Sequence, residues 1–293
     1  MMCLIGISCT KQDDMPTEPK LIFRFTFDST QTRLNAHGVE TGIQEGHAAQ
    51  SPVLNSMSVN YIELSPDDTT SPGQGPVIYR GDETKEGGST AIDFTRSVFA
   101  GNNEVFYAIS LKEIPPGEYK HLRLSVACQH FSVQFHIDTT MNDTVSIKDD
   151  FRGTMASFIG YNTYLATYNI KNQSVTVDEN REQGYWALES TLSAEGFSED
   201  ILFSGQAPAG ATTVVNPLFD TSPIPEGSDI VTAAFASRSL VISGDESSNV
   251  IVEVSISTNK SFEWKEVVHN GKWDILEEPV IDMGIRGMIP VIR

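Results

Sequence analysis

Alternation of apolar and polar residues with a period of two dominates this chain. Every second residue is apolar in residues 21–27, 105–111, 122–128 and 250–256, and several of the intervening residues are charged or carry hydroxyl groups. Because successive side chains of a strand point to opposite faces, this pattern places one face on an apolar core. We therefore predict strands of antiparallel sheets in these stretches.

Clusters of turn-forming residues separate the predicted strands. Proline, glycine and serine gather in residues 71–76, 86–89 and 114–117, whereas no long segment has clear helical periodicity. Residues 158–168 fit a helix or a strand about equally well, so both alternatives stay open. The predicted fold is a single all-β domain over residues 20–293, an antiparallel β-sandwich of immunoglobulin-like or jelly-roll-like type with long loops and little helix.

Two irregularities interrupt the alternation. The apolar positions are even-numbered through Cys128 and odd-numbered from Phe131 onward, which predicts a β-bulge at Gln129 and His130, since one extra residue exchanges the faces. Residues 205–229 are rich in Pro, Gly, Ser and Thr, and we predict a long loop there. Residues 139–150 resemble a turn, and we interpret them as a loop within one domain.

Asn270 and Gly271 stand between two stretches that contain Trp264 and Trp273. Asn-Gly flanked by such stretches predicts a two-residue β-hairpin. In that hairpin the two tryptophans would face each other and form an exposed aromatic platform for a sugar. The alternative is an ordinary cross-strand pair that stabilises the sheet.

The N-terminal residues indicate a lipoprotein signal. A short apolar run ends at Cys9, and a polar stretch follows at once. This pattern predicts a signal peptide in residues 1–8, a lipidated Cys9 as the mature N-terminus and a tether over residues 9–19, so that acyl chains anchor the protein to a membrane. No basic residue precedes Lys11, and we therefore expect the natural start to lie upstream of Met1. Asp13 and Asp14 resemble the acidic export signal of surface lipoproteins of Bacteroidetes-type bacteria, which indicates the outer face of the outer membrane.

Composition narrows the classes of partner. The formal net charge is −19, from 39 acidic and 20 basic residues, and no long block of like charge occurs. Such a surface repels nucleic acid, because phosphate binding needs clustered Lys and Arg. Once Cys3 is removed and Cys9 is lipidated, Cys128 is the only thiol left, so the folded part has no intrachain disulfide.

Three residues are candidates for a metal site. Cys128 and His130 are two residues apart, a spacing that would suit a thiolate–imidazole pair for copper unless the predicted bulge separates them. His47 lies in a glycine-punctuated segment that we interpret as a loop, and loops often carry binding residues. The alternative is that Cys128 is a small core residue and that the histidines are solvated. No hydrolase, phosphate-loop or zinc-protease motif is present, so we predict a protein without catalytic activity.

Three motifs resemble the MbnP-like family. They are Leu21-Ile22-Phe23-Arg24-Phe25, Asn55-Ser56-Met57-Ser58-Val59-Asn60-Tyr61-Ile62-Glu63-Leu64 and Ile114-Pro115-Pro116-Gly117-Glu118-Tyr119, and Gly184-Tyr185-Trp186-Ala187-Leu188-Glu189 falls where that family has an aromatic segment. The resemblance implies a periplasmic or lipid-anchored β-sandwich that handles copper beside a di-haem peroxidase-like partner. The block Gly46-His47-Ala48-Ala49-Gln50-Ser51-Pro52 is similar to Bacteroidetes-type surface lipoproteins. Two functions are therefore expected: surface recognition of a glycan or protein ligand or, alternatively, copper binding.

Overall fold

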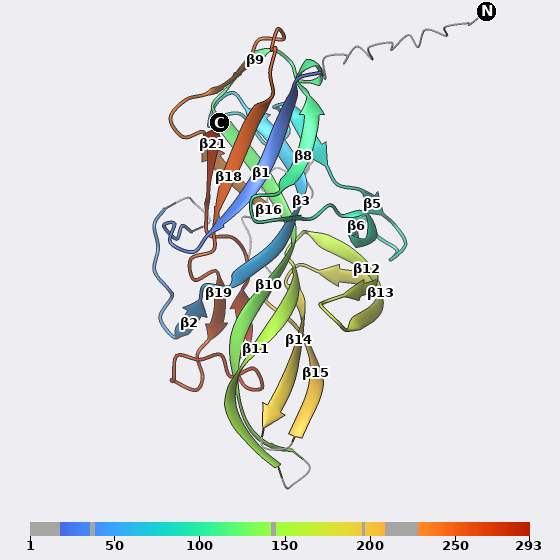
Figure 1. Ribbon diagram of the computed structural model, residues 1–293, viewed down its shortest axis with the longest axis vertical. Coiled ribbons are helices and arrows are strands. Elements are labelled where there is room, and N and C mark those ends of the chain that lie inside the picture. Colours follow the sequence, from blue (N-terminus) through green and yellow to red (C-terminus); the bar gives the residue numbers. More distant parts are fainter. Residues whose placement is uncertain (1–17, 36–38, 142–144, 195–196, 209–227) are drawn as a thin grey trace, which may run out of the picture.

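The computed structural model describes residues 18–35, 39–141, 145–194, 197–208 and 228–293. The signal peptide, Cys9 and most of the tether lie outside the described residues, as does most of the predicted loop 205–229. Strands make up most of the described chain, which confirms the all-β, sandwich-like fold with little helix (Figure 1). The helical elements of this part are two short 3-10 helices, η1 (Phe94–Arg96) and η2 (Leu111–Glu113).

A four-stranded sheet lies toward the upper end of Figure 1. Its strand order is β21 (Met288–Ile292), β18 (Val250–Ser257), β1 (Lys20–Asp28) and β8 (Val105–Ser110). β1 and β18 run parallel, with Phe23 opposite Val252, so the antiparallel prediction is wrong for this pair. The alternation itself is correct, because Phe23, Phe25, Val252 and Val254 are all completely buried.

The largest sheet has eight strands and runs the length of the molecule (Figure 1). Its main path is β15 (Phe197–Gln206), β14 (Tyr185–Ala194), β11 (Val145–Phe158), β10 (His121–Met141), β3 (Val53–Ser65) and β4 (Val77–Arg80), while β16 (Asp229–Ala234) pairs with β10 and β7 (Ala100–Gly101) with β3. β10 and β11 pair down to Met141 and Val145. Residues 139–150 therefore belong mainly to a hairpin, and their assignment as a loop was wrong.

β10 changes its partner in the middle, and the extra residue is Ala127. Residues 121–126 pair with β16, whereas residues 128–141 pair with β11. On the β3 side, Val126 lies opposite Val59 and Cys128 opposite Ser58, which leaves Ala127 without a partner in the register. The Ala127 carbonyl instead accepts the N–H groups of Ile159 and Gly160, both at 2.8 Å. The predicted bulge therefore exists but precedes Gln129, so Cys128 and His130 stay on one face.

Three smaller sheets complete the described part. β13 (Ser174–Glu182), β12 (Asn162–Asn169), β6 (Ala91–Asp93) and β5 (Glu83–Thr84) form one sheet, β17 (Leu240–Ile242) pairs with β9 (Gly117–Tyr119), and β2 (His47–Gln50), β19 (Phe262–Lys265) and β20 (Val280–Asp282) form the third. β12 resolves the open alternative for residues 158–168 in favour of a strand.

Two large apolar clusters fill the space between these sheets, and a third, small one joins Tyr61 and Ile230. The larger one draws on the chain from Leu21 to Met288, and Phe131, Val133 and Phe135 of β10 point into it. The smaller one lies on the opposite face of β10 and contains Cys128. Because the bulge at Ala127 exchanges the faces, Val126 packs in the larger cluster, whereas Ala127 and Cys128 belong to the smaller one. This arrangement positions the site described next.

Candidate functional site

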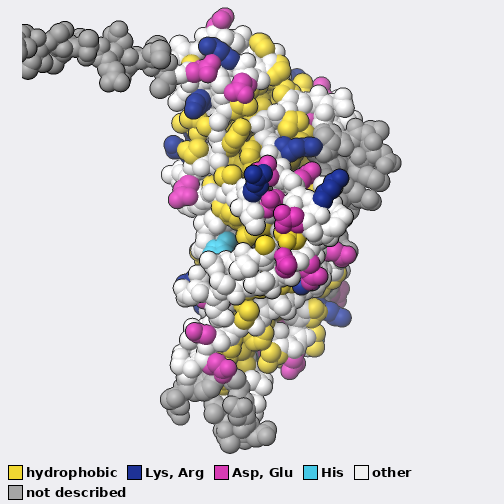
Figure 2. All heavy atoms as spheres, turned by 90° about the vertical axis from the view of Figure 1, so that its right-hand side faces the viewer, with side chains coloured by type: hydrophobic (Ala, Val, Ile, Leu, Met, Phe, Trp, Pro, Cys, Tyr) yellow, Lys and Arg dark blue, Asp and Glu magenta, His cyan; other side chains and the backbone are white. Residues whose placement is uncertain are grey.

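The smaller cluster opens to solvent through a pocket of about 270 Å³ on one face of β10. We call it the aromatic pocket, and its lining residues are Ser56, Phe94, Phe99, Cys128, Gln129, His130, Ala156, Phe158, Asn169 and Ile170. Ligand sites are typically concave and mostly apolar with a few polar groups, and this pocket has that composition. Figure 2 shows hydrophobic side chains gathered along the middle of one face of the molecule, between charged groups.

Paired strands position the floor of the aromatic pocket. In the β10–β11 register Cys128 lies opposite Phe158, and His130 lies opposite Ala156. Phe94 begins η1, whose N-terminus is capped by the Asp93 side chain, which accepts the Thr95 N–H at 3.0 Å. A capped turn holds its first residue in place, so Phe94 is held against the floor rather than free in a loop.

The aromatic rings form a continuous path from solvent to the core. Phe94 contacts Phe99 with ring centroids 5.7 Å apart, Phe158 at 5.3 Å and Tyr168 at 5.7 Å, all in edge-to-face geometry. Phe99 is 36% exposed, whereas Phe158 is 1% exposed. Edge-to-face packing is the favoured geometry of aromatic pairs. A further ring inserted beside Phe99 would therefore extend this series of edge-to-face contacts.

His130 supplies a polar group at the wall of the pocket. Its Nε2 contacts the Ile170 carbonyl, and its Nδ1 lies 3.3 Å from Nδ2 of Asn55. A carbonyl only accepts, so Nε2 carries the proton and Nδ1 accepts from the Asn55 amide. Hydrogen bonds to both ring nitrogens thus fix the orientation of the imidazole in the wall of the pocket.

Cys128 behaves as an apolar wall residue. Its side chain is 2% exposed, and burial raises the pKa of the thiol well above its ordinary value. The thiolate is the form that binds metal, and burial disfavours it. The structure therefore brings Cys128 and His130 to one pocket, as their spacing predicted, but neither presents a free donor to copper there.

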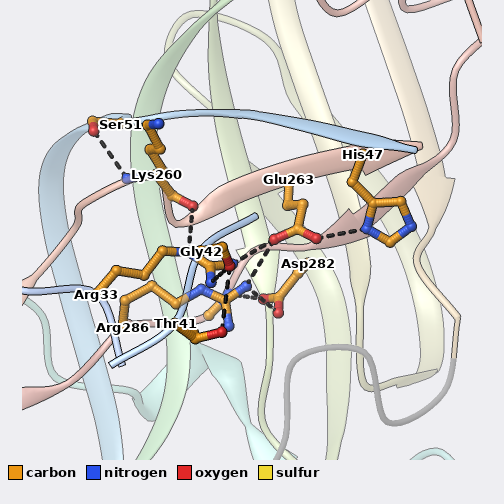
Figure 3. A network of polar contacts seen from close by, with 10 residues as sticks. Arg33, Thr41, Gly42, His47, Ser51, Lys260, Glu263, Asp282 and Arg286 are labelled. Carbon is orange, nitrogen blue, oxygen red and sulfur yellow. Dashed lines mark hydrogen bonds and ion pairs between the residues drawn. The ribbon is translucent and has the colours of Figure 1, made fainter. Parts of the chain in front are cut away.

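His47 lies at a different site and does not join Cys128 and His130. Its Nδ1 is 2.6 Å from Oε1 of Glu263, and Oε2 of that carboxylate is 2.5 Å from Nη2 of Arg33. Arg286 and Asp282 extend this network, which ties β2, β19 and β20 together (Figure 3). The three predicted ligands thus do not form one copper site. Among the residues that the structure describes, no group of three His, Cys, Asp or Glu side chains is arranged to hold a metal ion.

The two tryptophans do not form the predicted exposed platform. Trp264 pairs with Ala48 of β2 and Val280 of β20, and the segment around Asn270 and Gly271 is irregular rather than a two-residue hairpin. Both indoles are 1% exposed. They belong to the larger apolar cluster, where Trp273 contacts Phe262 with centroids 4.8 Å apart. Core packing takes precedence over the local turn signal because each indole buries a large apolar area.

Sequence reasoning missed Phe94, Phe99 and Phe158 as site residues. The available signal was the adjacent apolar pair Val98 and Phe99, which precedes a Gly-Asn-Asn turn and continues no alternating strand. Both residues of that pair are exposed in the structure. Apolar side chains beside a turn, without a strand to bury them, are a general indication of a binding surface.

Comparison with known proteins assigns this chain to no family. The chain matches no protein-family model, no curated protein and no solved structure at a significant level. The resemblance to the MbnP-like family and to Bacteroidetes-type surface lipoproteins therefore stays a prediction. The described part of the chain contains no helix with the length and hydropathy of a membrane span.

Proposed function

We propose that this protein is a non-catalytic recognition module of the cell envelope, held by lipid at Cys9 on the outer membrane and facing outward. It binds an apolar or aromatic group of its ligand in the aromatic pocket. The observation that carries this proposal is the pocket itself, an open hollow of about 270 Å³ whose lining includes the partly exposed Phe99.

The exposure of Phe99 supports a binding role. Phe99 and its neighbour Val98 are 36% and 41% exposed. Burying a fully exposed phenylalanine is worth about 1.5–3 kcal/mol. Since Phe99 is 36% exposed, a partner that covers it gains roughly 0.5–1 kcal/mol from the remaining area. The net charge of −19 would add long-range attraction for a ligand that carries positive charge beside its apolar group.

Binding of a neutral fluorescent probe tests this proposal. N-phenyl-1-naphthylamine suits the pocket because it carries aromatic rings and no charge that the acidic surface would repel. We expect Phe99→Ala to weaken its binding by about tenfold, because the remaining apolar area of Phe99 and one aromatic contact are lost together. Leu276→Ala is the matched control, since Leu276 is another exposed apolar residue outside the pocket. Equal affinity of wild type and Phe99→Ala would show that the pocket is not the binding site.

Copper binding is the second candidate, because Cys128 and His130 share one face of β10 and one pocket. It is the weaker proposal, since the raised pKa of the thiol and the two engaged ring nitrogens of His130 both oppose ligation. Dialysis of copper-loaded protein against a weak chelator tests it. Stoichiometric copper that is lost in a Cys128→Ala, His130→Ala double variant would favour copper over recognition. Sub-stoichiometric copper, unchanged in a His47→Ala, Cys128→Ala double variant, would exclude it.

A further inference from the structure

The Asn270-Gly271 pair, which forms no hairpin, lies in the loop between β19 and β20, in the lower part of Figure 1. It is the only Asn-Gly pair of the sequence, and both residues are exposed. Gly271 has φ 71°, in the left-handed region that glycine adopts without strain. Glycine has no side chain to hinder its backbone nitrogen, so this nitrogen can approach the side-chain amide of the preceding asparagine closely.

A carboxylate holds the backbone nitrogen of Gly271. This N–H donates to Oε1 of Glu266 at 2.6 Å. Glu266 directly follows β19, and its own N–H donates to the Gly46 carbonyl at 3.0 Å, so its backbone is tied to the fold. A general base must lie within hydrogen-bond reach of the proton that it removes. Glu266 meets this condition for the Gly271 nitrogen.

The side-chain amide of Asn270 is held at both of its ends. Its Oδ1 accepts the Lys272 N–H at 2.7 Å, and its Nδ2 donates to Oδ2 of Asp274 at 2.8 Å. A donor at the carbonyl oxygen stabilises the negative charge that develops there when a nucleophile attacks the carbon. Holding the amide in one orientation also removes part of the entropy cost of a reaction with its neighbour. A nucleophile, a base and an oxyanion donor therefore meet at one dipeptide.

We propose that Asn270 is a self-modification site, at which the protein loses ammonia and gains a negative charge. The Gly271 nitrogen forms a bond to Cγ of Asn270 while its proton passes to Glu266, and a cyclic succinimide results. The bond from Cγ to Nδ2 breaks, and this nitrogen leaves as ammonia with one proton from solvent. Water then opens the ring at either carbonyl, which gives aspartate or isoaspartate without any change of oxidation state. Because Asn270 and Gly271 are both exposed, water reaches the ring.

The new carboxylate would lie opposite Asp274, to which Asn270 now donates a hydrogen bond. Asp274 is 7% exposed, and its N–H donates to Oε2 of Glu278 at 2.9 Å. Oε1 of Glu278 accepts the N–H groups of Val267 and Val268 at 2.7 and 2.9 Å, so these contacts hold the loop together. Adjacent carboxylates repel each other, and the modification is therefore expected to loosen the loop. This device is independent of the aromatic pocket, whose lining contains none of these residues.

Peptide mapping of the full chain after incubation in neutral buffer tests this inference. We expect the Asn270 peptide of wild type to gain the mass difference between an amide and an acid, and to separate into aspartate and isoaspartate forms. Asn249 is the internal reference in the same digest, because it is exposed and hydrogen-bonded but is followed by valine. Glu266→Gln keeps an acceptor for the Gly271 N–H and removes the base, so we expect deamidation more than about tenfold slower in native buffer. In urea, where the loop is lost, the two chains should react at the same rate.

Three further variants complete the test. Glu266→Asp keeps the charge but shortens the side chain away from the Gly271 N–H, and should slow the reaction if Glu266→Gln fails to fold. Glu277→Gln is the matched control and should react like wild type, because Glu277 is exposed in the same loop and makes none of the contacts to Asn270 or Gly271. Asn270→Asp carries the charge of the product and should unfold at a lower urea concentration than wild type. Reaction of Asn270 no faster than that of Asn249, or equal native rates of wild type, Glu266→Gln and Glu266→Asp, would overturn the inference.

Discussion

Nδ1 of His47 lies 2.6 Å from Oε1 of Glu263, and this contact joins β2 to β19. The same carboxylate also holds Arg33, whose guanidinium donates to the Gly42 carbonyl at 2.8 Å. Glu263 and Arg33 are 5% and 8% exposed. A buried carboxylate that bonds both His47 and Arg33 fixes the relative position of the segments that supply them.

Removing the charge of Glu263 should therefore destabilise the fold. Glu263→Gln removes the carboxylate that Arg33 bonds directly, and breaking a buried pair in this way costs about 3–5 kcal/mol. Urea unfolding followed by fluorescence measures the change in the free energy of unfolding. Glu277→Gln is the matched control, because Glu277 is exposed and makes none of the contacts of this network. An equal stability of the two variants would contradict a structural role for this network.

Removing the charge of Asp229, unlike that of Glu263, should stabilise the fold. Burial, and then the negative charge of Asp282, raises the pKa of Asp229 well above its ordinary 3.8, although Arg286 opposes the rise. Its Oδ2 has no hydrogen-bond partner among the described residues. A raised pKa means that the folded state binds this proton more tightly. The corresponding stability is fully present below the unfolded pKa and is lost as pH rises through the folded pKa.

Asp229→Asn should consequently stabilise the protein at neutral pH, and the gain should vanish below pH about 4, where the unfolded carboxyl is protonated too. Thermal unfolding at both pH values measures this. Asp67→Asn is a control of opposite sign, because hydrogen bonds from Thr69 and Thr70 lower the pKa of Asp67 to about 2. The stability that this lowered pKa contributes is present above the unfolded pKa and is lost as pH falls toward 2. Asp67→Asn should therefore be destabilising at neutral pH.

The Cys128 thiol should react slowly in the folded protein. Burial raises its pKa, and the thiolate is the reactive form. In a full chain with Cys3→Ser and Cys9→Ser, we expect Ellman's reagent to label Cys128 more than about tenfold more slowly in buffer than in urea, since each unit of pKa is a factor of ten in thiolate. Rapid labelling of the native chain would contradict the described burial of the pocket floor.

Cys9→Ala should release the protein from the membrane fraction. When the gene is expressed with its upstream codons, wild type should carry lipid by mass spectrometry, because the proposed function requires diacylglycerol on Cys9 as the anchor. Cys3→Ala is the control and should stay in the membrane, since Cys3 lies in the predicted signal peptide. A soluble wild type without lipid would rule out the envelope localisation.

The sequence alone identified several of the strands and which of their faces are buried. In β1 and β18 the apolar residues recur at every second position, and Phe23, Phe25, Val252 and Val254 are buried as predicted. The alternation also revealed an extra residue in β10, although the bulge lies at Ala127 rather than at Gln129 and His130. A period of two reports faces reliably because it follows from the geometry of each strand by itself.

Only the tertiary structure decided which strands pair and which side chains meet. Lys20 and Asn249 are 229 positions apart, yet they bond at the start of the parallel pair of β1 and β18. Trp273 packs against Phe262 instead of forming the predicted hairpin. Cys128 and Phe94 come from separate parts of the chain, yet they line one pocket. Partner choice depends on the total apolar area that distant segments bury together. Since this quantity belongs to the whole fold, the periodicity of a single segment does not contain it.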